Sequence, residues 1–306
     1  MTPPPKCRAC GSPRVALRGR KQGEFIRQEY SFYACADCRF MAVEPFSGFA
    51  IYDAAYYRGE GPDSLVNYEN EYRNWRATHR RHEFHDLARL AEDFLRQRAP
   101  AERGPVHWLD FGCGAGGLLK YLRERGRIAQ RPVEITGHDV GAYAELLRDQ
   151  DGFRILDFQQ ISAAPSDQYD VITMIEVIEH LPEPAEAIAL VARLLKPGGL
   201  LLLTTGNLEA PIPRRGGIHH RYCIPEIHVS LFNPTALTRV YRAAGLEPIS
   251  VRYRGAIRFK VLRALPQSGA VLRLTNLALG LPPLRWMIDA AYGVSAMPCA
   301  TKPLRS

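Results

Sequence analysis

Several features that mark membrane and secreted proteins are missing from this sequence of 306 residues. It has no apolar run that approaches the roughly 18 residues needed to span a membrane. Its first residues, Met1 to Cys7, lack the apolar core of a signal peptide. The hydrophobic fraction, 46%, is ordinary for a soluble globular protein. We therefore expect a cytoplasmic protein with room for one large domain and a small one.

Acidic residues are outnumbered by basic ones, 32 to 40, which gives a formal net charge of +8. An excess of positive charge favours an anionic partner, such as a nucleic acid, a nucleotide, a phosphorylated sugar or a membrane surface. The charge does not choose among these partners. A surface that is simply rich in arginine explains it equally well.

Four of the seven cysteines form a regular pattern. Cys7-x-x-Cys10 and Cys35-x-x-Cys38 are two knuckles with 24 residues between them. In a reducing compartment this spacing indicates a structural zinc site with four thiolate ligands, whereas two disulfides or a redox pair would suit an oxidising one. The intervening segment predicts a hairpin with its turn near Gly23. Because so short a segment has little core of its own, we expect the metal to supply its folding energy.

The residues that follow the two knuckles differ. Gly11 follows the first knuckle, but Arg39 follows the second, where zinc ribbons often have glycine. The three remaining cysteines are each expected to be buried as core filler; they are Cys113, Cys223 and Cys299.

A glycine-rich stretch dominates the centre of the chain. An apolar run over 106–111 leads into a turn that contains Gly112, Gly114 and Gly117, and Leu118 then opens a helical pattern. This order predicts a buried strand, a tight loop and a helix whose free N–H groups face a ligand. The spacing also fits G-x-G-x-x-G, so a nicotinamide dehydrogenase is an alternative.

Strand and helix patterns alternate after the glycine-rich loop. Alternation of this kind predicts an α/β fold with a parallel sheet, helices on both faces, and ligands at the carboxyl ends of the strands. The expected strands are 106–111, 133–139, 153–156, 169–175, 200–205 and 248–253, and the expected helices are 115–125, 142–150 and 184–195.

Three motifs in this region resemble those of one enzyme family. Leu109 to Gly116 resembles motif I of the class I S-adenosylmethionine (SAM) methyltransferases. Tyr169 to Leu181 resembles their motif IV, and Leu194 to Gly199 resembles the turn before their fifth strand. The motifs follow the family's order and spacing. The resemblance covers about Gly104 to Ser306 and implies a Rossmann-like sheet of seven strands, the last of them antiparallel.

The resemblance divides the chain into three parts. Residues 1–45 form the zinc ribbon, residues 46–103 form an aromatic connector and helical cap, and residues 104–306 form the methyltransferase domain. Residues 254–292, basic and apolar together, become an insertion before the final strand. This insertion suits an interfacial helix at a membrane or a dimer face, or a packing helix within the domain, which we favour.

The resemblance implies SAM as the cofactor and assigns residues to hold it. The glycine-rich loop approaches the methionine end through its backbone, and Asp110 orients that loop or accepts from the amine. Asp139 accepts from the two ribose hydroxyls, because its two oxygens suit two donors. Asp157 receives the adenine amine, or is a turn residue. The loop residues assigned here are Gly112, Gly114 and Gly116.

Methyl transfer needs alignment and, for some acceptors, a base. Glu176, Glu179 and His180 follow the fourth strand, where substrate meets cofactor. We expect His180 to be the general base, with Glu179 orienting it. The same residues together with His228 resemble the metal-binding set of small-RNA terminal 2′-O-methyltransferases, so a second divalent metal remains open.

A long loop over 206–233 carries arginine and imidazole groups that suit an anionic acceptor. The candidate substrate residues in it are His219, His220, Arg221, Tyr222 and His228. By contrast, we expect Arg73, Arg76 and Arg80, in the charged segment before the first strand, to lie on a solvated helix face.

The whole arrangement resembles bacterial nucleotide-sugar C-methyltransferases and related small-molecule or polysaccharide methyltransferases. The shared features are the cysteine-rich start, a Tyr56-Tyr57 connector and the Glu179-His180 pair. The C-methyltransferases usually carry a further C-terminal domain, for which this chain is too short, so transfer to oxygen or nitrogen is open as well. We expect an acceptor that is a sugar, a nucleotide-sugar or a natural-product intermediate. The alternatives are methylation of RNA, at a base nitrogen or a ribose 2′-oxygen, and a non-catalytic SAM-binding scaffold.

Overall fold

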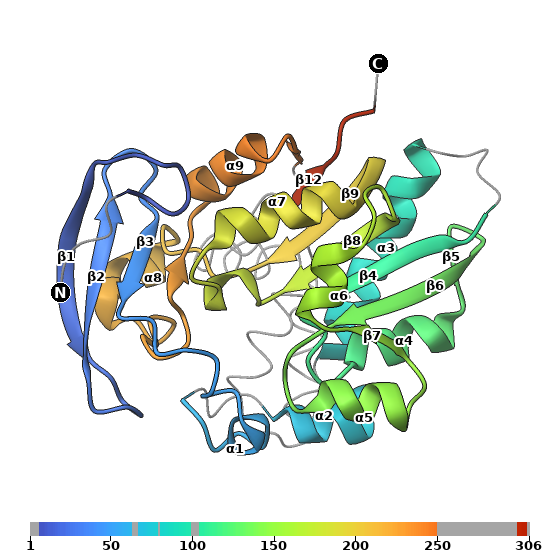
Figure 1. Cartoon of the computed structure of the whole chain (residues 1–306), viewed down its shortest axis with the longest axis horizontal. Helices are drawn as coiled ribbons and strands as arrows, with labels where there is room; N and C mark the ends of the chain where they lie inside the picture. Colours follow the sequence, from blue (N-terminus) through green and yellow to red (C-terminus); the bar gives the residue numbers. More distant parts are fainter. Residues whose placement is uncertain (1–5, 63–66, 79, 99–103, 250–298, 305–306) are drawn as a thin grey trace.

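The computed structural model describes residues 6–62, 67–78, 80–98, 104–249 and 299–304. The described strands form two sheets, one of eight strands and one of four (Figure 1). Helices cover both faces of the larger sheet, and the smaller sheet lies at one end of it (Figure 1).

The larger sheet has a parallel centre. Its strands are β4 (Val106–Phe111), β5 (Arg127–Ile128), β6 (Arg131–His138), β7 (Arg154–Leu156), β8 (Tyr169–Ile175), β9 (Leu195–Thr204), β11 (Glu247–Ile249) and β12 (Cys299–Thr301). Their order is β11-β12-β9-β8-β4-β6-β5, and β7 also pairs with β6. β12 is antiparallel to both β9 and β11. The predicted α/β Rossmann-like sheet of seven strands is confirmed, and β5 adds a two-residue strand at its edge.

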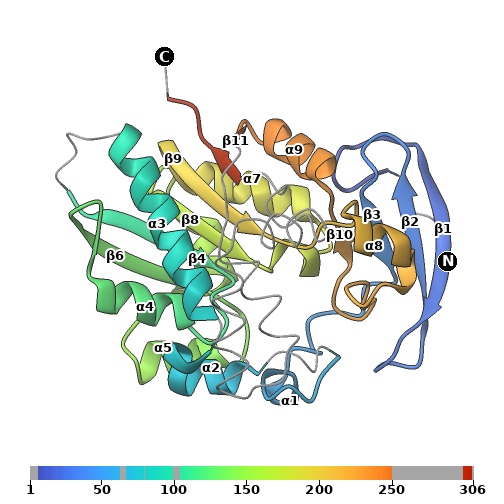
Figure 2. The same cartoon turned by 180° about the vertical axis from the view of Figure 1, so that it is seen from behind.

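The central strands are apolar toward both faces because helices cover both. Val171 and Leu200 pack toward α3 (Arg80–Arg98) and α4 (Gly117–Arg125), which are seen in front of the sheet in Figure 2. Ile172 and Leu201 pack on the opposite side. The helices there are α6 (Phe158–Ala163), α7 (Pro184–Leu194) and α9 (Pro234–Ala243), while α5 (Tyr143–Asp149) packs beside β7.

The smaller sheet contains the predicted cysteine ribbon and one strand from the long loop that follows β9. Its strands are β1 (Val15–Gln22), β2 (Glu29–Cys35), β3 (Met41–Glu44) and β10 (Ser230–Leu231), in that order. The predicted hairpin is present as β1 and β2, paired from Val15 with Cys35 to Gln22 with Glu29. β10 pairs antiparallel with β3, so the ribbon sheet is completed from far along the chain.

The ribbon also shares a hydrophobic core with the larger sheet. Cys38 and Phe40 belong to the same buried cluster as Phe232 and Leu237, and the rings of Phe40 and Phe232 meet edge to face at 5.0 Å between centroids. We expected metal to supply the ribbon's folding energy. The structure adds a second source, which is burial of the ribbon's apolar side chains against α9.

The connector runs from the ribbon to the larger sheet through short helices. These are α1 (Ala54–Tyr57), α2 (Tyr68–Asn74) and the 3-10 helix η1 (Trp75–Ala77), after which α3 follows. Tyr56 and Tyr57 are buried against Tyr143. Tyr68 lies over the glycine-rich loop, since a Cβ built on Gly114 would be 3.4 Å from its ring. The connector therefore covers the edge of the sheet where a ligand is expected.

The predicted insertion over 254–292 and most of the predicted sixth strand lie outside the described residues. Among the helices that the structure describes, none is long and apolar enough to cross a membrane.

Asn233 joins the second knuckle to the start of α9 and gives a stability test. Its side-chain oxygen accepts from Ala236 N at the start of α9, and its Nδ2 donates to the Cys38 carbonyl at 3.0 Å. Because Asn233 is buried, Asn233→Ala removes a helix cap and orphans a ribbon carbonyl. We expect a loss of about 1–3 kcal/mol in the free energy of unfolding, measured by chemical denaturation.

The matched control is Asn67→Ala, which removes an exposed cap on α2 whose oxygen accepts from Asn70 N. This control is expected to cost about 1 kcal/mol or less. Equal losses in the two variants would contradict a role for Asn233 in joining the second knuckle to α9.

Candidate cofactor and acceptor site

The glycine-rich loop folds as a tight turn between β4 and α4. Gly112, Gly114 and Gly116 all have left-handed backbone conformations, with φ of 79°, 51° and 75°, which glycine adopts without strain. The N–H groups of Gly112 and Cys113 donate to the His138 carbonyl at the end of β6. The loop is thereby held at the carboxyl edge of the sheet, with the start of α4 opening beside it.

Asp139 ties this loop to the next one. Its Oδ2 accepts from Gly114 N at 2.7 Å, and its Oδ1 accepts from Gly141 N at 2.6 Å. Each carboxylate oxygen can accept a further hydrogen bond, so Asp139 can hold the loops and receive ribose hydroxyls together. Its assignment to the ribose remains a prediction.

Asp157 lies at the start of α6, and its side chain forms a capping box with Gln160. Asp139 and Asp157 are each followed by a large apolar side chain that is unusually exposed. Val140 is 67% exposed and Phe158 is 64% exposed. A flat purine needs apolar cover of this kind together with polar partners at its edges. Contact of Asp157 with adenine remains a prediction alongside its capping role.

Arg80 lies between two buried acids, an environment that the sequence did not reveal. Its Nε lies 3.3 Å from Glu71 Oε2 and 3.5 Å from Glu83 Oε2, and both acids are buried. Burial opposes the charge on Arg80, but the two carboxylates outweigh it and raise its pKa. The expectation of a solvated face is therefore wrong for Arg80. Its charge is therefore taken up by Glu71 and Glu83, close to the glycine-rich loop.

Asp110 is buried at the end of β4 and is held by a chain of hydrogen bonds. Trp108 Nε1 donates to Thr173 Oγ1 at 3.0 Å, and Thr173 Oγ1 donates to Asp110 Oδ1 at 2.7 Å. Burial raises the pKa of Asp110 to about 7, although Thr173 and Arg80 lower it. The carboxyl group is therefore poised to gain or lose a proton near neutral pH.

Glu179 belongs to a second group of side chains. It lies just beyond β8, on the 3-10 helix η2 (Ile178–His180). It is fully buried, its Oε2 accepts from Thr205 Oγ1 at 2.9 Å, and its Oε1 accepts from Tyr222 OH at 2.8 Å. Burial, and then the nearby Glu176 carboxylate, raise the pKa of Glu179 well above its usual range. Glu176 itself has a left-handed backbone, with φ of 52°.

His180 is oriented by a backbone carbonyl. Its Nδ1 lies 2.9 Å from the Ile227 carbonyl oxygen and 2.8 Å from Tyr52 OH. Because a carbonyl only accepts, Nδ1 carries the hydrogen and the neutral ring has its lone pair on Nε2. Ile227 and Tyr52 thus orient His180, whereas the predicted role of Glu179 in orienting it is not tested.

His228 completes this group. Its Nδ1 donates to the Tyr222 carbonyl, which again places the lone pair on Nε2. Its ring centroid lies 4.9 Å from that of His180 and 4.4 Å from that of Tyr222. Burial, followed by the nearby His180, lowers the pKa of His228 to about 3, so the ring is neutral. Glu179, His180 and His228 each offer a ligand atom within 4.8 Å of the others.

The long loop contributes unequally to this group, which we call the acceptor cluster (Glu179, His180, Tyr222 and His228). The loop contains α8 (Pro211–Gly216) and the 3-10 helix η3 (Gly217–His219). Of the predicted substrate residues, the structure brings Tyr222 and His228 into the cluster. His220 accepts from Tyr222 N through Nδ1, while His219 and Arg221 are exposed, and their contact with substrate remains a prediction.

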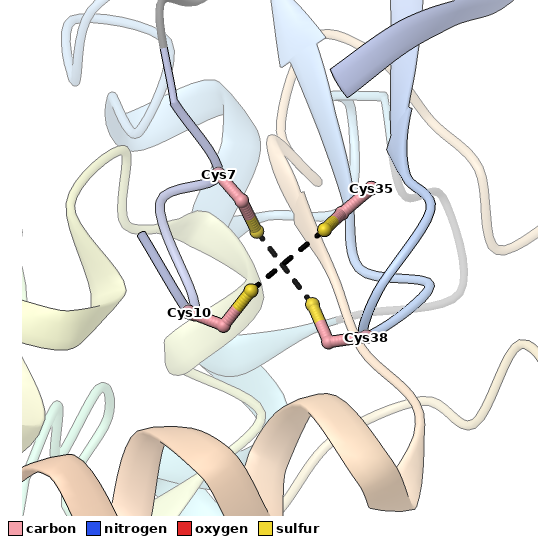
Figure 3. Close-up of side chains that lie close together, drawn as sticks. All are labelled: Cys7, Cys10, Cys35 and Cys38. Atoms are coloured by element: carbon pink, nitrogen blue, oxygen red, sulfur yellow. Dashed lines mark hydrogen bonds between the residues drawn. The ribbon is translucent and has the colours of Figure 1, made fainter. Parts of the chain in front are cut away.

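The four knuckle cysteines converge as the spacing predicts (Figure 3). Sγ of Cys7 lies 3.6 Å from Sγ of Cys38, and Sγ of Cys10 lies 3.7 Å from Sγ of Cys35. Tetrahedral zinc, with Zn–S bonds of about 2.3 Å, separates its sulfurs by about 3.8 Å. All four are free thiols, and the set fits a zinc ion.

The backbone of the two knuckles is alike despite the residue that follows each one. Gly11 N donates to Cys7 O at 2.8 Å, and Arg39 N donates to Cys35 O at 2.9 Å. Both Gly11 and Arg39 are left-handed, with φ of 72° and 61°. Arg39 therefore takes the glycine conformation at a cost in backbone strain. The three cysteines outside the knuckles, Cys113, Cys223 and Cys299, are buried as expected.

The zinc assignment predicts about one zinc ion per chain by elemental mass spectrometry. Cys38→Ser is expected to lower the zinc content and the melting temperature, because a hydroxyl is a poor zinc ligand. Cys223→Ser, at a buried cysteine outside the knuckles, is expected to keep its zinc. Full zinc content in the Cys38 variant would contradict a site with four thiolates.

The raised pKa of Asp110 predicts how unfolding depends on pH. Between its ordinary value of 3.8 and about 7, the folded state holds the proton more tightly than the unfolded chain. The free energy of unfolding should therefore fall as pH rises through this range, by about 1.4 kcal/mol per pKa unit. Asp110→Asn removes this fall, so the variant gains stability over the wild type between pH 5 and pH 8.

Denaturant unfolding of the ligand-free protein at the two pH values measures this difference. Asp157→Asn is the control, because an exposed cap residue that is replaced by an equally good cap should show no such change. A stability difference between the wild type and the Asp110→Asn variant that is the same at both pH values would refute the assignment.

Comparison with known proteins agrees with the site. A family model described as a methyltransferase domain matches residues 79–251, more than half of the chain. The ubiquinone biosynthesis O-methyltransferase of Saccharophagus degradans is 30% identical over 178 residues, which cover 53% of this chain and 72% of that protein. The enzyme of the same name from Pseudomonas aeruginosa is 36% identical over 132 residues, and the match covers 40% of this chain and about half of that relative, 53%.

Solved structures give weaker matches. A SAM-dependent methyltransferase from Archaeoglobus fulgidus is 18% identical, with a TM-score of 0.40, covering 70% of this chain and 94% of that one. A putative methyltransferase from Bacillus halodurans is 17% identical, with a TM-score of 0.39, covering 52% and 69%. The family match, the parallel sheet and the glycine-rich loop lead to one conclusion: this chain belongs to the methyltransferase domain family and is a SAM-dependent methyltransferase.

Proposed function

We propose that the protein transfers the methyl group of SAM to a hydroxyl oxygen of a small-molecule acceptor, and that the acceptor cluster handles the hydroxyl proton. The observation that carries the proposal is the convergence of Glu179, His180 and His228 at the carboxyl end of β8. The relatives that share 30% to 36% identity are named O-methyltransferases, which supports oxygen as the methylated atom.

The reaction is a displacement at the methyl carbon. When SAM is bound, its sulfonium gives up the methyl group readily, because the sulfur leaves as a neutral thioether. Asp139 and the glycine-rich loop hold the cofactor end of the line, while the acceptor cluster holds the hydroxyl end. His180 Nε2 takes the hydroxyl proton as the new carbon–oxygen bond forms and the carbon–sulfur bond breaks. Alignment of the two ends supplies much of the rate.

A divalent cation is a second candidate for the same step. Both imidazoles carry their lone pairs on Nε2, because their Nδ1 atoms donate to carbonyls of Ile227 and Tyr222. Metal-binding histidines are held in this way. A cation would also offset the repulsion between the Glu176 and Glu179 carboxylates. When bound by Glu179, His180 and His228, it would lower the pKa of the acceptor hydroxyl.

Aromatic side chains suggest the shape of the acceptor. Phe46 and Phe49 meet at 5.0 Å, Phe49 and Tyr52 at 6.3 Å, and Tyr52 and His180 at 5.5 Å between ring centroids. Phe49 is 44% exposed, so this row of rings leads from solvent to the acceptor cluster. It favours an acceptor with a flat apolar face, such as a natural-product intermediate, among the small molecules that the sequence predicts.

Substitution of His180 tests the proton-handling role. We expect His180→Ala to lower kcat by about 10²- to 10⁴-fold, because the proton then loses the acceptor that the Ile227 carbonyl orients, while the affinity for SAM is unchanged. His85→Ala, at an exposed histidine of α3, is the control and should keep its turnover. Wild-type turnover in both the His180→Ala and His228→Ala variants would refute the proposal.

Chelation separates the two candidates for this step. If His180 acts alone, a chelator that leaves the ribbon's zinc in place should not change the rate. If instead a cation held by Glu179, His180 and His228 activates the hydroxyl, the rate should fall and should return on addition of Mg²⁺ or Mn²⁺. Zinc content is measured in the same samples, so that loss of the ribbon metal is recognised.

A further inference from the structure

The β1–β2 hairpin of the ribbon forms hydrogen bonds with the long loop at two points. Lys21 Nζ donates to the Cys223 carbonyl at 3.0 Å. At the hairpin turn, the N–H groups of Phe25 and Ile26 donate to Glu226 Oε1 at 2.8 Å and 3.3 Å. The two contacts join the ribbon to the segment that leads into His228.

Glu226 is built into this contact. It is 1% exposed, so its hydrogen bonds with the turn replace those with water, and loss of its carboxylate would leave two amides unpaired. Its second oxygen, Oε2, has no hydrogen-bond partner among the described residues. The stability of its own loop does not explain why this buried acid accepts its hydrogen bonds from the turn of a distant hairpin.

The residues beside Glu226 hold the acceptor cluster. The Ile227 carbonyl receives the Nδ1 hydrogen of His180 and lies 3.3 Å from Tyr52 OH. His228 is itself a member of the cluster. Val229 N then donates to the Glu179 carbonyl at 2.8 Å, and Val43 N of β3 donates to the Val229 carbonyl at 3.0 Å. The ribbon therefore contacts this segment on both sides of Ile227 and His228.

The cofactor cradle is built from other elements. Asp110, Gly112 and Asp139 lie at the ends of β4 and β6, and the hydrogen bonds that shape them come from Thr173, His138 and the loop glycines. A disturbance of the ribbon hairpin should therefore reach the acceptor side before it reaches the cofactor side.

We propose that the ribbon is a positioning element of the acceptor site, in which Glu226 and Lys21 hold residues 223–229 so that the Ile227 carbonyl fixes His180 and His228 faces it. The proposal rests on the proposed function of His180. It gives the ribbon a part in the reaction, because the ribbon sets the geometry of groups that it does not supply.

Two substitutions at Glu226 in the zinc-loaded protein test this contact of Glu226 and Lys21 with residues 223–229, which we call the clamp. Glu226→Leu removes both hydrogen bonds to the turn, whereas Glu226→Gln keeps an oxygen that can accept them. We expect kcat to fall by about 10- to 100-fold in the Leu variant, with the dissociation constant for SAM unchanged, and to be near wild type in the Gln variant. Glu29→Leu, on the exposed side of the same hairpin, is the control and should keep its turnover.

A spectroscopic readout makes the test independent of turnover. The ¹⁵N chemical shifts of the His180 ring should report the Nδ1–H form in the wild type and in Glu226→Gln, and a mixture of tautomers in Glu226→Leu. If the Leu variant does not fold, Lys21→Met provides the same measurements, because it removes the hydrogen bond to the Cys223 carbonyl, together with the ion pair to the exposed Glu24, and leaves the hydrogen bonds of Glu226 in place.

The clamp is refuted if the folded variants keep both the wild-type kcat and the wild-type His180 shifts. Failure of the proposed function looks different. In that case His180→Ala keeps its turnover, while the His180 shifts in Glu226→Leu still report whether the ribbon positions the ring.

Discussion

Parallel pairing of β4 with β6 and β8 is the constraint on which the rest of the site depends. In parallel strands the carboxyl ends meet at one edge, so Asp110, Asp139 and the turn after Ile175 are brought to the same edge from three distant parts of the chain. Packing on both faces fixes the register, because a slip by one residue would move Leu109 into the core on the opposite face, where Trp108 now packs. Cofactor and acceptor chemistry can then lie side by side.

On the acceptor side, the chemistry depends on backbone carbonyls. The carbonyls of Ile227 and Tyr222 choose the tautomers of His180 and His228. The segment that supplies them continues into β10, which pairs with β3 of the ribbon. The ribbon, the long loop and the histidines thus form one hydrogen-bonded unit, even though the ribbon and the loop are far apart in the sequence.

Local patterns in the sequence predicted the parts whose geometry is local. The two knuckles and the glycine-rich loop depend on residues a few positions apart, and both fold as their spacing predicts. Alternation of strand and helix predicted the sheet, because apolar periodicity reports burial directly. His228 was found as a candidate on two grounds, because it lies in the long loop that carries arginine and imidazole groups and because it resembled part of a known metal-binding set.

Contacts between distant residues could not be predicted in this way. The sequence around Arg80 is typical of an exposed, charged helix face. It does not predict that Glu71 and Glu83 are buried beside Arg80. Glu226 and Lys21 gave no signal either, because each has its partner about 200 residues away in the sequence. The sequence shows that residue 52 is a tyrosine, but only the fold of the connector shows that its hydroxyl forms a hydrogen bond with His180.

The most direct test of the central claim, that this methyltransferase acts on a small molecule, is transfer of a labelled methyl group from SAM into a lysate of the source cell. The products are separated into small molecules, RNase-sensitive material and the remainder, with the His180→Ala variant run in parallel. The account predicts label in the small-molecule fraction, as a methyl ether, and its loss in the variant. Label that disappears on RNase treatment would contradict it and would favour methylation of RNA.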